Sequence, residues 1–140
     1  MPSHLWTSAC ALALLFAVQS TGSMAQSQPK IGSATSTKNN VQGIVGGTTQ
    51  TLSTGSELYA NETVRTGAAS IADMQFIDQS NMSVGPVSEV HLDKFVYDPA
   101  GSAGSVVINA TRGVFRFVTG NQDKKAYEIK TPYGTLGIRG

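Results

Sequence analysis

From Val41 onward the chain consists of short runs rich in Val, Ile, Thr, Phe and Tyr, separated by clusters of Gly, Asn, Asp and Ser. Such runs favour β-strands, and such clusters favour tight turns. Outside the first 25 residues, no stretch of ten or more residues shows the apolar spacing of an amphipathic helix. This texture constrains the fold more than any other feature, because it predicts an all-β domain of many short strands.

Ten strands are predicted from these runs. In the run Ser70–Phe76 apolar side chains alternate with mostly polar ones, so one face of this strand is expected to be buried. The expected architecture is a single β-sandwich or roll, and a short β-solenoid is the alternative, since both use short strands and glycine turns. The predicted strands are Val41–Val45, Thr49–Leu52, Glu62–Thr66, Ser70–Phe76, Asn81–Val84, Glu89–Tyr97, Ser105–Asn109, Gly113–Val118, Ala126–Lys130 and Thr135–Ile138.

The first 25 residues are typical of a secretory signal peptide. The apolar run Ala11–Val18 is followed by polar residues and then by Ser23 and Ala25, the small residues that signal peptidase requires, so cleavage is expected after Ala25. The run is shorter than the roughly 20 apolar residues that span a bilayer. An uncleaved N-terminal anchor is the alternative, because the segment before the run has no Lys or Arg.

The segment 26–40 is rich in Ser, Thr, Asn and Gln and contains few apolar residues, so it is expected to be a flexible polar leader. The domain is expected to occupy residues 41–140. The signal peptide predicts an exported protein, periplasmic or extracellular. No second apolar stretch approaches membrane length, so the mature chain is expected to have no membrane span. The single cysteine, Cys10, lies in the signal segment, so the mature chain is expected to lack disulfides and cysteine metal sites.

Charge and motifs argue against nucleic-acid binding and against catalysis. The formal net charge is +1 and no basic stripe is present, which makes nucleic acid an unsuitable partner. His91 is the only histidine after the signal segment and is expected to be a surface or cross-strand residue. Asp73 and Asp78 are expected to be solvated residues at the end of a strand. We therefore predict no enzyme, no cofactor and no catalytic residue.

A metal site is the other use that these residues could have. Glu89, His91 and Asp93 share one face of a predicted strand, and three such side chains could bind a divalent ion weakly. The neighbouring Lys94 and the expected exposure of this face favour a plain polar surface instead, so no metal site is predicted.

An ordered series of signals resembles the FecR domain family. It begins with "VQGIV" at Val41 and continues with "LSTGSELYANETVRTGAAS", similar to the family pattern L-x-x-G-x-x-[VL]-x-x-x-[DE]-x-[IV]-x-T-G. It continues with "ADMQFIDQSNMSVGPVSEVHL" and "VVINATRGVFRFV", and it closes with "YEIKTPYGTLGIRG". The series covers about 100 residues, and its order is more specific than any one piece. One departure is Gln79, where the family usually has glycine, because glutamine loses easy access to positive φ.

The resemblance implies structural roles for several residues that shape turns and strand ends. In relatives the final Arg-Gly is followed by Thr and further strand, so either this chain is truncated or its last strand ends early. The implied motif residues are Thr66, Gly67, Asp78, Gly113, Thr131, Pro132, Arg139 and Gly140.

The resemblance implies a non-catalytic exported module of the bacterial cell envelope that binds a protein or glycan partner, by strand addition at an exposed edge. The alternative is a periplasmic ligand sensor related to iron-uptake signal transduction and sigma-factor regulation, without its own transmembrane segment. Such a sensor would need a pocket with a few convergent polar groups. The candidate ligand-binding residues are Tyr59, Arg65, Arg112 and Arg116.

Overall fold

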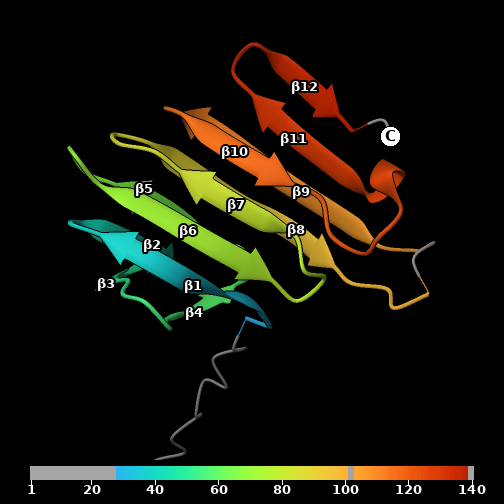
Figure 1. Ribbon diagram of the computed structural model, residues 1–140, viewed down its shortest axis with the longest axis horizontal. Helices are drawn as coiled ribbons and strands as arrows, with labels where there is room; N and C mark the ends of the chain where they lie inside the picture. The colour runs from blue at the N-terminus through green and yellow to red at the C-terminus, as the bar shows by residue number, and fades with distance from the viewer. Residues whose placement is uncertain (1–27, 101–102, 139–140) are drawn as a thin grey trace, which may run out of the picture.

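The computed structural model describes residues 28–100 and 103–138, which form twelve β-strands and one turn of 3-10 helix, η1 (Figure 1). The absence of any longer helix from the described residues agrees with the sequence prediction. The elements are β1 (Lys30–Lys38), β2 (Val41–Val45), β3 (Thr48–Thr51), β4 (Glu57–Tyr59), β5 (Thr63–Thr66), β6 (Ile71–Phe76), β7 (Asn81–Val84), β8 (Glu89–Val96), β9 (Ser105–Arg112), β10 (Phe115–Val118), η1 (Lys124–Ala126), β11 (Tyr127–Thr131) and β12 (Gly134–Gly137).

The strands form two sheets that pack face to face (Figure 1). The five-stranded sheet has the order β10-β7-β6-β1-β4, and the seven-stranded sheet has the order β12-β11-β9-β8-β5-β2-β3. In the described residues every pair of neighbouring strands is antiparallel except β9 and β11. The all-β prediction is confirmed, and the antiparallel pairing makes the two layers a sandwich and not a solenoid of parallel coils.

One hydrophobic core lies between the sheets. The predicted alternation in β6 is confirmed, because Ala72, Met74 and Phe76 are buried while Ile71 and Gln75 are exposed. The same parity continues in β7 through Met82 and Val84, and β5, β8, β9 and β11 close the core from the seven-stranded sheet.

The prediction that residues 26–40 form a flexible leader is wrong for the part that forms strand β1. Residues 30–38 of that segment form the longest strand of the five-stranded sheet, between β4 and β6, and Ile31 and Ala34 are buried in the core. The segment has few apolar residues, and its register shifts twice, once against each neighbour, so it has no regular two-residue alternation. Gly32 lies so close to β6 that a Cβ there would be 2.4 Å from the Gln75 carbonyl oxygen.

All ten sequence-predicted strands are present, and more than half of their ends differ from the prediction by one to three residues. Strand β4 was not predicted, because its three residues are too few to show a pattern. The predicted signal peptide, residues 1–25, lies outside the described residues.

Ile31→Ala tests the assignment of β1 to the core. We expect a loss of about 2–5 kcal/mol in the free energy of unfolding, because the substitution removes a buried side chain and leaves a cavity. Urea unfolding followed by circular dichroism measures it. Ile71→Ala, at a site where the side chain is exposed, should cost less than about 1 kcal/mol. Equal losses at the two positions would contradict a core role for β1.

Candidate functional site

Five connections meet at one end of the sandwich, which we call the loop end and define by residues 38–40, 66–71, 84–89, 112–116 and 130–134. It lies toward the upper left in Figure 1. Thr66 and Gly67 organise it. The Thr66 hydroxyl donates to the Gly85 carbonyl at 2.6 Å and accepts from the Ser88 N–H at 2.9 Å. The Gly67 carbonyl accepts from the Val87 N–H at 3.0 Å, so both residues fix the β7–β8 loop.

Gly113 joins the β9–β10 turn to the same loop. Its φ is +93°, and a Cβ there would be 1.9 Å from the Ser88 hydroxyl, so only glycine fits. The Ser88 hydroxyl accepts from the Val114 N–H at 3.0 Å, and the Gly85 N–H donates to the Val114 carbonyl at 2.8 Å. The two turns are therefore held in one fixed arrangement.

Thr131 and Pro132 form the β11–β12 turn at the loop end. The Thr131 hydroxyl donates to the Gly134 carbonyl at 2.9 Å and accepts from the Tyr133 N–H at 3.3 Å. Arg139 and Gly140, the last two motif residues implied by the resemblance, lie outside the described residues.

Asp78, in the β6–β7 turn, is fully buried, so its expected place as a solvated turn residue is wrong. Its Oδ1 accepts hydrogen bonds from the Ser80 N–H and hydroxyl. Its Oδ2 accepts from Gln122 Nε2 at 3.1 Å and from the Tyr127 hydroxyl at 2.7 Å. Because Tyr127 begins β11, this carboxylate connects the two sheets.

The protonation states of this network follow from its contacts. Burial alone would raise the pKa of Asp78, but hydrogen bonds from Ser80, Tyr127 and Gln122 outweigh burial and hold the pKa below its usual value. Burial, together with the Asp78 carboxylate, raises the pKa of Tyr127 to about 12. Asp78 is therefore ionised and Tyr127 protonated at neutral pH.

Only some of the contacts of Asp78 could be predicted from the sequence. The spacing of Asp78 and Ser80 is a turn signal, because an aspartate often accepts a bond from the N–H two residues on. Gln122 is 44 residues away from Asp78, and no local pattern pairs them. Gln79 stands where the family usually has glycine, and its φ of +67° is a backbone conformation that glycine adopts more easily. At Gly120 a Cβ would be 2.0 Å from the Asp78 carbonyl oxygen, so this loop packs directly on the turn.

The four candidate ligand-binding residues do not line one common pocket. Arg65 and Arg112 converge on Glu89, with Arg65 Nε at 3.0 Å and Arg112 Nη2 at 3.8 Å from the same carboxylate oxygen. Arg112 lines a hollow with Tyr133, whereas exposed Arg116 lines another with Val114. Tyr59 lines a third. Both arginines that contact Glu89 are largely exposed, so these ion pairs contribute at most about 1 kcal/mol each.

His91 is half-buried on β8, and its Nδ1 lies 2.9 Å from the hydroxyl of Thr63 on the neighbouring strand, the cross-strand place expected for it. Glu89 is occupied by the two arginines, and Asp93 Oδ2 accepts from Asn109 at 3.3 Å. In the part of the chain that the structure describes, no three His, Cys, Asp or Glu side chains gather as metal ligands would.

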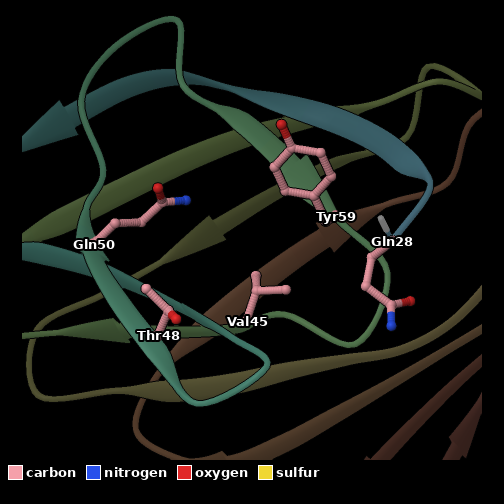
Figure 2. A pocket seen from close by; sticks show the side chains of 5 residues that line it. All are labelled: Gln28, Val45, Thr48, Gln50 and Tyr59. Atoms are coloured by element: carbon pink, nitrogen blue, oxygen red, sulfur yellow. The ribbon is translucent and has the colours of Figure 1, made fainter. Parts of the chain in front are cut away.

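A cavity of about 260 Å³ lies where the two sheets open between β3 and β4 (Figure 2). Thr48 and Gln50 line it from β3, Val45 from the end of β2, and Tyr59 from β4, with Gln28 across from β3. The cavity lies between the outer strands of the two sheets, β3 of the seven-stranded sheet and β4 of the five-stranded one.

The wall of the cavity on β4 is held by a chain of polar contacts. The Tyr59 hydroxyl donates to Glu57 at 2.7 Å, and Glu57 also pairs with Lys30 at 3.1 Å. The bond from Tyr59, together with Lys30, lowers the pKa of Glu57, and the same bond raises the pKa of Tyr59. The tyrosine ring is therefore fixed at the cavity.

Strand β3 is a free edge beside this cavity. The Leu52 N–H donates to the Val41 carbonyl at 2.9 Å, so Leu52 faces β2. Backbone groups in an antiparallel ladder alternate in direction, so those of Thr49 and Thr51 point away from β2. All four residues of β3 are exposed, and in the described residues β3 pairs with β2 alone.

Glu62 follows the β4 turn and is fully buried. Its Oε2 accepts from the Tyr59 N–H at 2.8 Å, while Oε1 has no hydrogen-bond partner among the described residues. Oε1 points at Gly43, where a Cβ would be only 2.1 Å away. Burial raises the pKa of Glu62, and the bond from Tyr59 offsets only part of this effect.

Asp78→Asn tests the carboxylate that connects the sheets. At pH 7 we expect a loss of about 2–3 kcal/mol in unfolding free energy, because the new amide NH₂ would face the donor Gln122 Nε2. The lowered pKa means that the stabilisation by Asp78 is present above its unfolded value and disappears as the pH falls through the folded value. The difference between wild type and variant should therefore shrink in acid.

Urea titrations from pH 7 down to pH 3 measure this difference. Asp73→Asn is the matched control, because Asp73 is half-buried and accepts a bond from Ser83, so its loss should be at most about 1 kcal/mol. A variant difference that is independent of pH would contradict the role assigned to Asp78.

Glu62→Gln should have the opposite pH dependence. Because burial raises the folded pKa, the carboxyl favours folding at low pH, and this advantage is lost as the pH rises from the unfolded value, near 4.5, through the folded value. The glutamine can still accept the Tyr59 N–H bond but does not titrate. The stability difference should therefore shift in favour of the variant as the pH rises from 4 to 8. A flat difference in urea titrations would show that the pKa of Glu62 is the same in the folded and unfolded states, and would contradict the effect of burial on this carboxyl.

None of the helices in residues 28–100 and 103–138 is long and apolar enough to cross a membrane.

In comparisons with known proteins, no curated protein and no solved structure matches the chain. The family model described as FecR protein matches residues 62–140, more than half of the 140 residues, from the turn before β5 to beyond β12. FecR proteins are envelope-associated signalling domains linked to iron uptake. The chain therefore belongs to the FecR protein family.

Proposed function

We propose that this FecR domain is an exported, non-catalytic module of the cell envelope that takes part in signalling by binding an extended segment of a partner protein along β3. The observation that carries the proposal is the free edge of β3, with the backbone groups of Thr49 and Thr51 directed outward. A partner segment that added here would form main-chain hydrogen bonds and extend the seven-stranded sheet.

The composition of β3 supports this choice over β4 and β10, the outer strands of the five-stranded sheet. Edge strands are normally protected by charge, proline, bulges or shortness. Strand β4 has three residues, carries Glu57 and pairs through a bulge, and β10 carries Arg116. Strand β3, with the sequence TTQT, has no charge, proline or bulge.

The cavity between β3 and β4 supplies a means of selecting the partner. Thr48, Gln50 and the buried Leu52 lie on one face of the strand, the face toward the five-stranded sheet. A strand added to β3 would place every second side chain on that same face, beside Val45 and the ring of Tyr59. Strand addition supplies affinity through the backbone, and a pocket for alternate side chains supplies specificity.

Thr49→Pro tests the proposal, because proline removes the outward N–H while leaving the bonds to β2 in place. Random ten-residue peptides displayed on phage would be selected on the wild-type domain, and the dissociation constants of selected peptides would be measured by fluorescence anisotropy. We expect Thr49→Pro to weaken binding at least about tenfold, the equivalent of one lost hydrogen bond of roughly 1.4 kcal/mol.

Thr49→Val is the matched control, since it keeps the N–H and the branched shape and should bind like wild type. Urea unfolding of both variants checks that the domain remains folded. Unchanged affinity in Thr49→Pro, or failure to select any peptide that competes at this edge, would contradict strand addition at β3.

A further inference from the structure

The loop end displays large apolar side chains to solvent. Tyr133 is 99 % exposed, Val114 70 %, Val87 53 % and Ile71 40 %, and they come from four different connections or strand starts. Single exposed apolar residues are ordinary, but several gathered on one surface mark an interaction site. The hydrogen bonds among Thr66, Gly67, Gly85, Ser88 and Val114 hold these tips in place.

Val87, in the loop between β7 and β8, has a strained backbone conformation. Its φ is +49°, in the left-handed region that β-branched residues avoid. Such a conformation costs about 1–3 kcal/mol, and a half-exposed side chain recovers little of this by burial. Asparagine or glycine would adopt this backbone more easily. The strain at Val87 is therefore not offset by burial of its side chain within the folded domain.

The charge around these tips is positive. Within the residue ranges that define the loop end, Lys38, Arg112, Arg116 and Lys130 are exposed, and the one acidic residue is Glu89. The resulting formal charge of +3 exceeds the +1 of the whole chain, so the remainder carries −2. Glu89 is itself contacted by Arg65 and Arg112, which reduces its negative field.

We propose that the loop end docks on the surface of an anionic phospholipid bilayer. The tips of Val87, Val114 and Tyr133 would enter the interfacial layer, where the apolar body of a tyrosine is buried and its hydroxyl stays hydrated. The surrounding lysines and arginines would contact lipid phosphates, and each basic residue near an anionic surface adds to the attraction. The combination of projecting apolar tips and a basic ring matches this surface in both polarity and charge.

Vesicle co-sedimentation tests the proposal. The probe is large vesicles of phosphatidylglycerol and phosphatidylethanolamine, with phosphatidylcholine vesicles for comparison. The protein is the chain from Gln26, the form that cleavage after Ala25 would leave, so that the apolar run Ala11–Val18 cannot contribute to binding. We expect binding to the anionic vesicles only, and a marked fall in binding when salt is raised to 0.5 M.

The double variant Val87→Asn/Val114→Asn should bind at least about tenfold more weakly, because two apolar tips no longer enter the interface. Its unfolding free energy should not fall, since asparagine relieves the strain at position 87. Val96→Asn/Val118→Asn is the matched control, with two valines of 44 % and 45 % exposure outside the loop end, and should bind like wild type.

Three results would overturn the proposal: no sedimentation with anionic vesicles, equal binding by the double variant, or an equal loss in the control variant. A wild type that ignores vesicles but elutes as a dimer, with the double variant monomeric, would assign the surface to a second copy of the chain. The variants leave β3 unchanged, so failure here and failure of peptide binding at β3 are separate outcomes.

Discussion

The arrangement of the two sheets depends on the buried carboxylate of Asp78. One side chain accepts bonds from its own turn, from Gln122 and from Tyr127, and Gln122 in turn accepts from the Asp98 N–H at 3.3 Å. The β6–β7, β8–β9 and β10–β11 connections therefore meet at a single charged group. A buried charge is tolerated only when its hydrogen bonds are satisfied, so the loops around Asp78 have little freedom to differ.

The sequence predicted those parts of the fold in which local pattern and tertiary environment agree. Strands β2 and β7 have the predicted bounds, since each is a short segment with apolar side chains between turn residues. Strand β1 escaped prediction because most of its residues are polar and half-buried or exposed, and because its bulges disrupt the alternation. Asp78 escaped because its partner Gln122 is distant in sequence, and the free edge of β3 depends on sheet order, which no run of residues specifies.

Five of the motif residues and the proposed binding edge lie in different parts of the molecule. Thr66, Gly67, Gly113, Thr131 and Pro132 all lie at the loop end, where they fix turns. The edge of β3 depends on the order of the strands, which places β3 at the outside of the seven-stranded sheet, beside the cavity that Thr48 and Gln50 line. Turn geometry thus defines one surface and strand order defines the other.

The order of the strands also determines how the domain responds to force and to cleavage. The chain passes from one sheet to the other between β1 and β2, β3 and β4, β4 and β5, β5 and β6, β7 and β8, β9 and β10, and β10 and β11. Neither sheet is a continuous piece of chain, so no single cut of the chain separates one layer from the other. A load applied at β3 would therefore be shared across both layers, and the domain should transmit it as a single cooperative body.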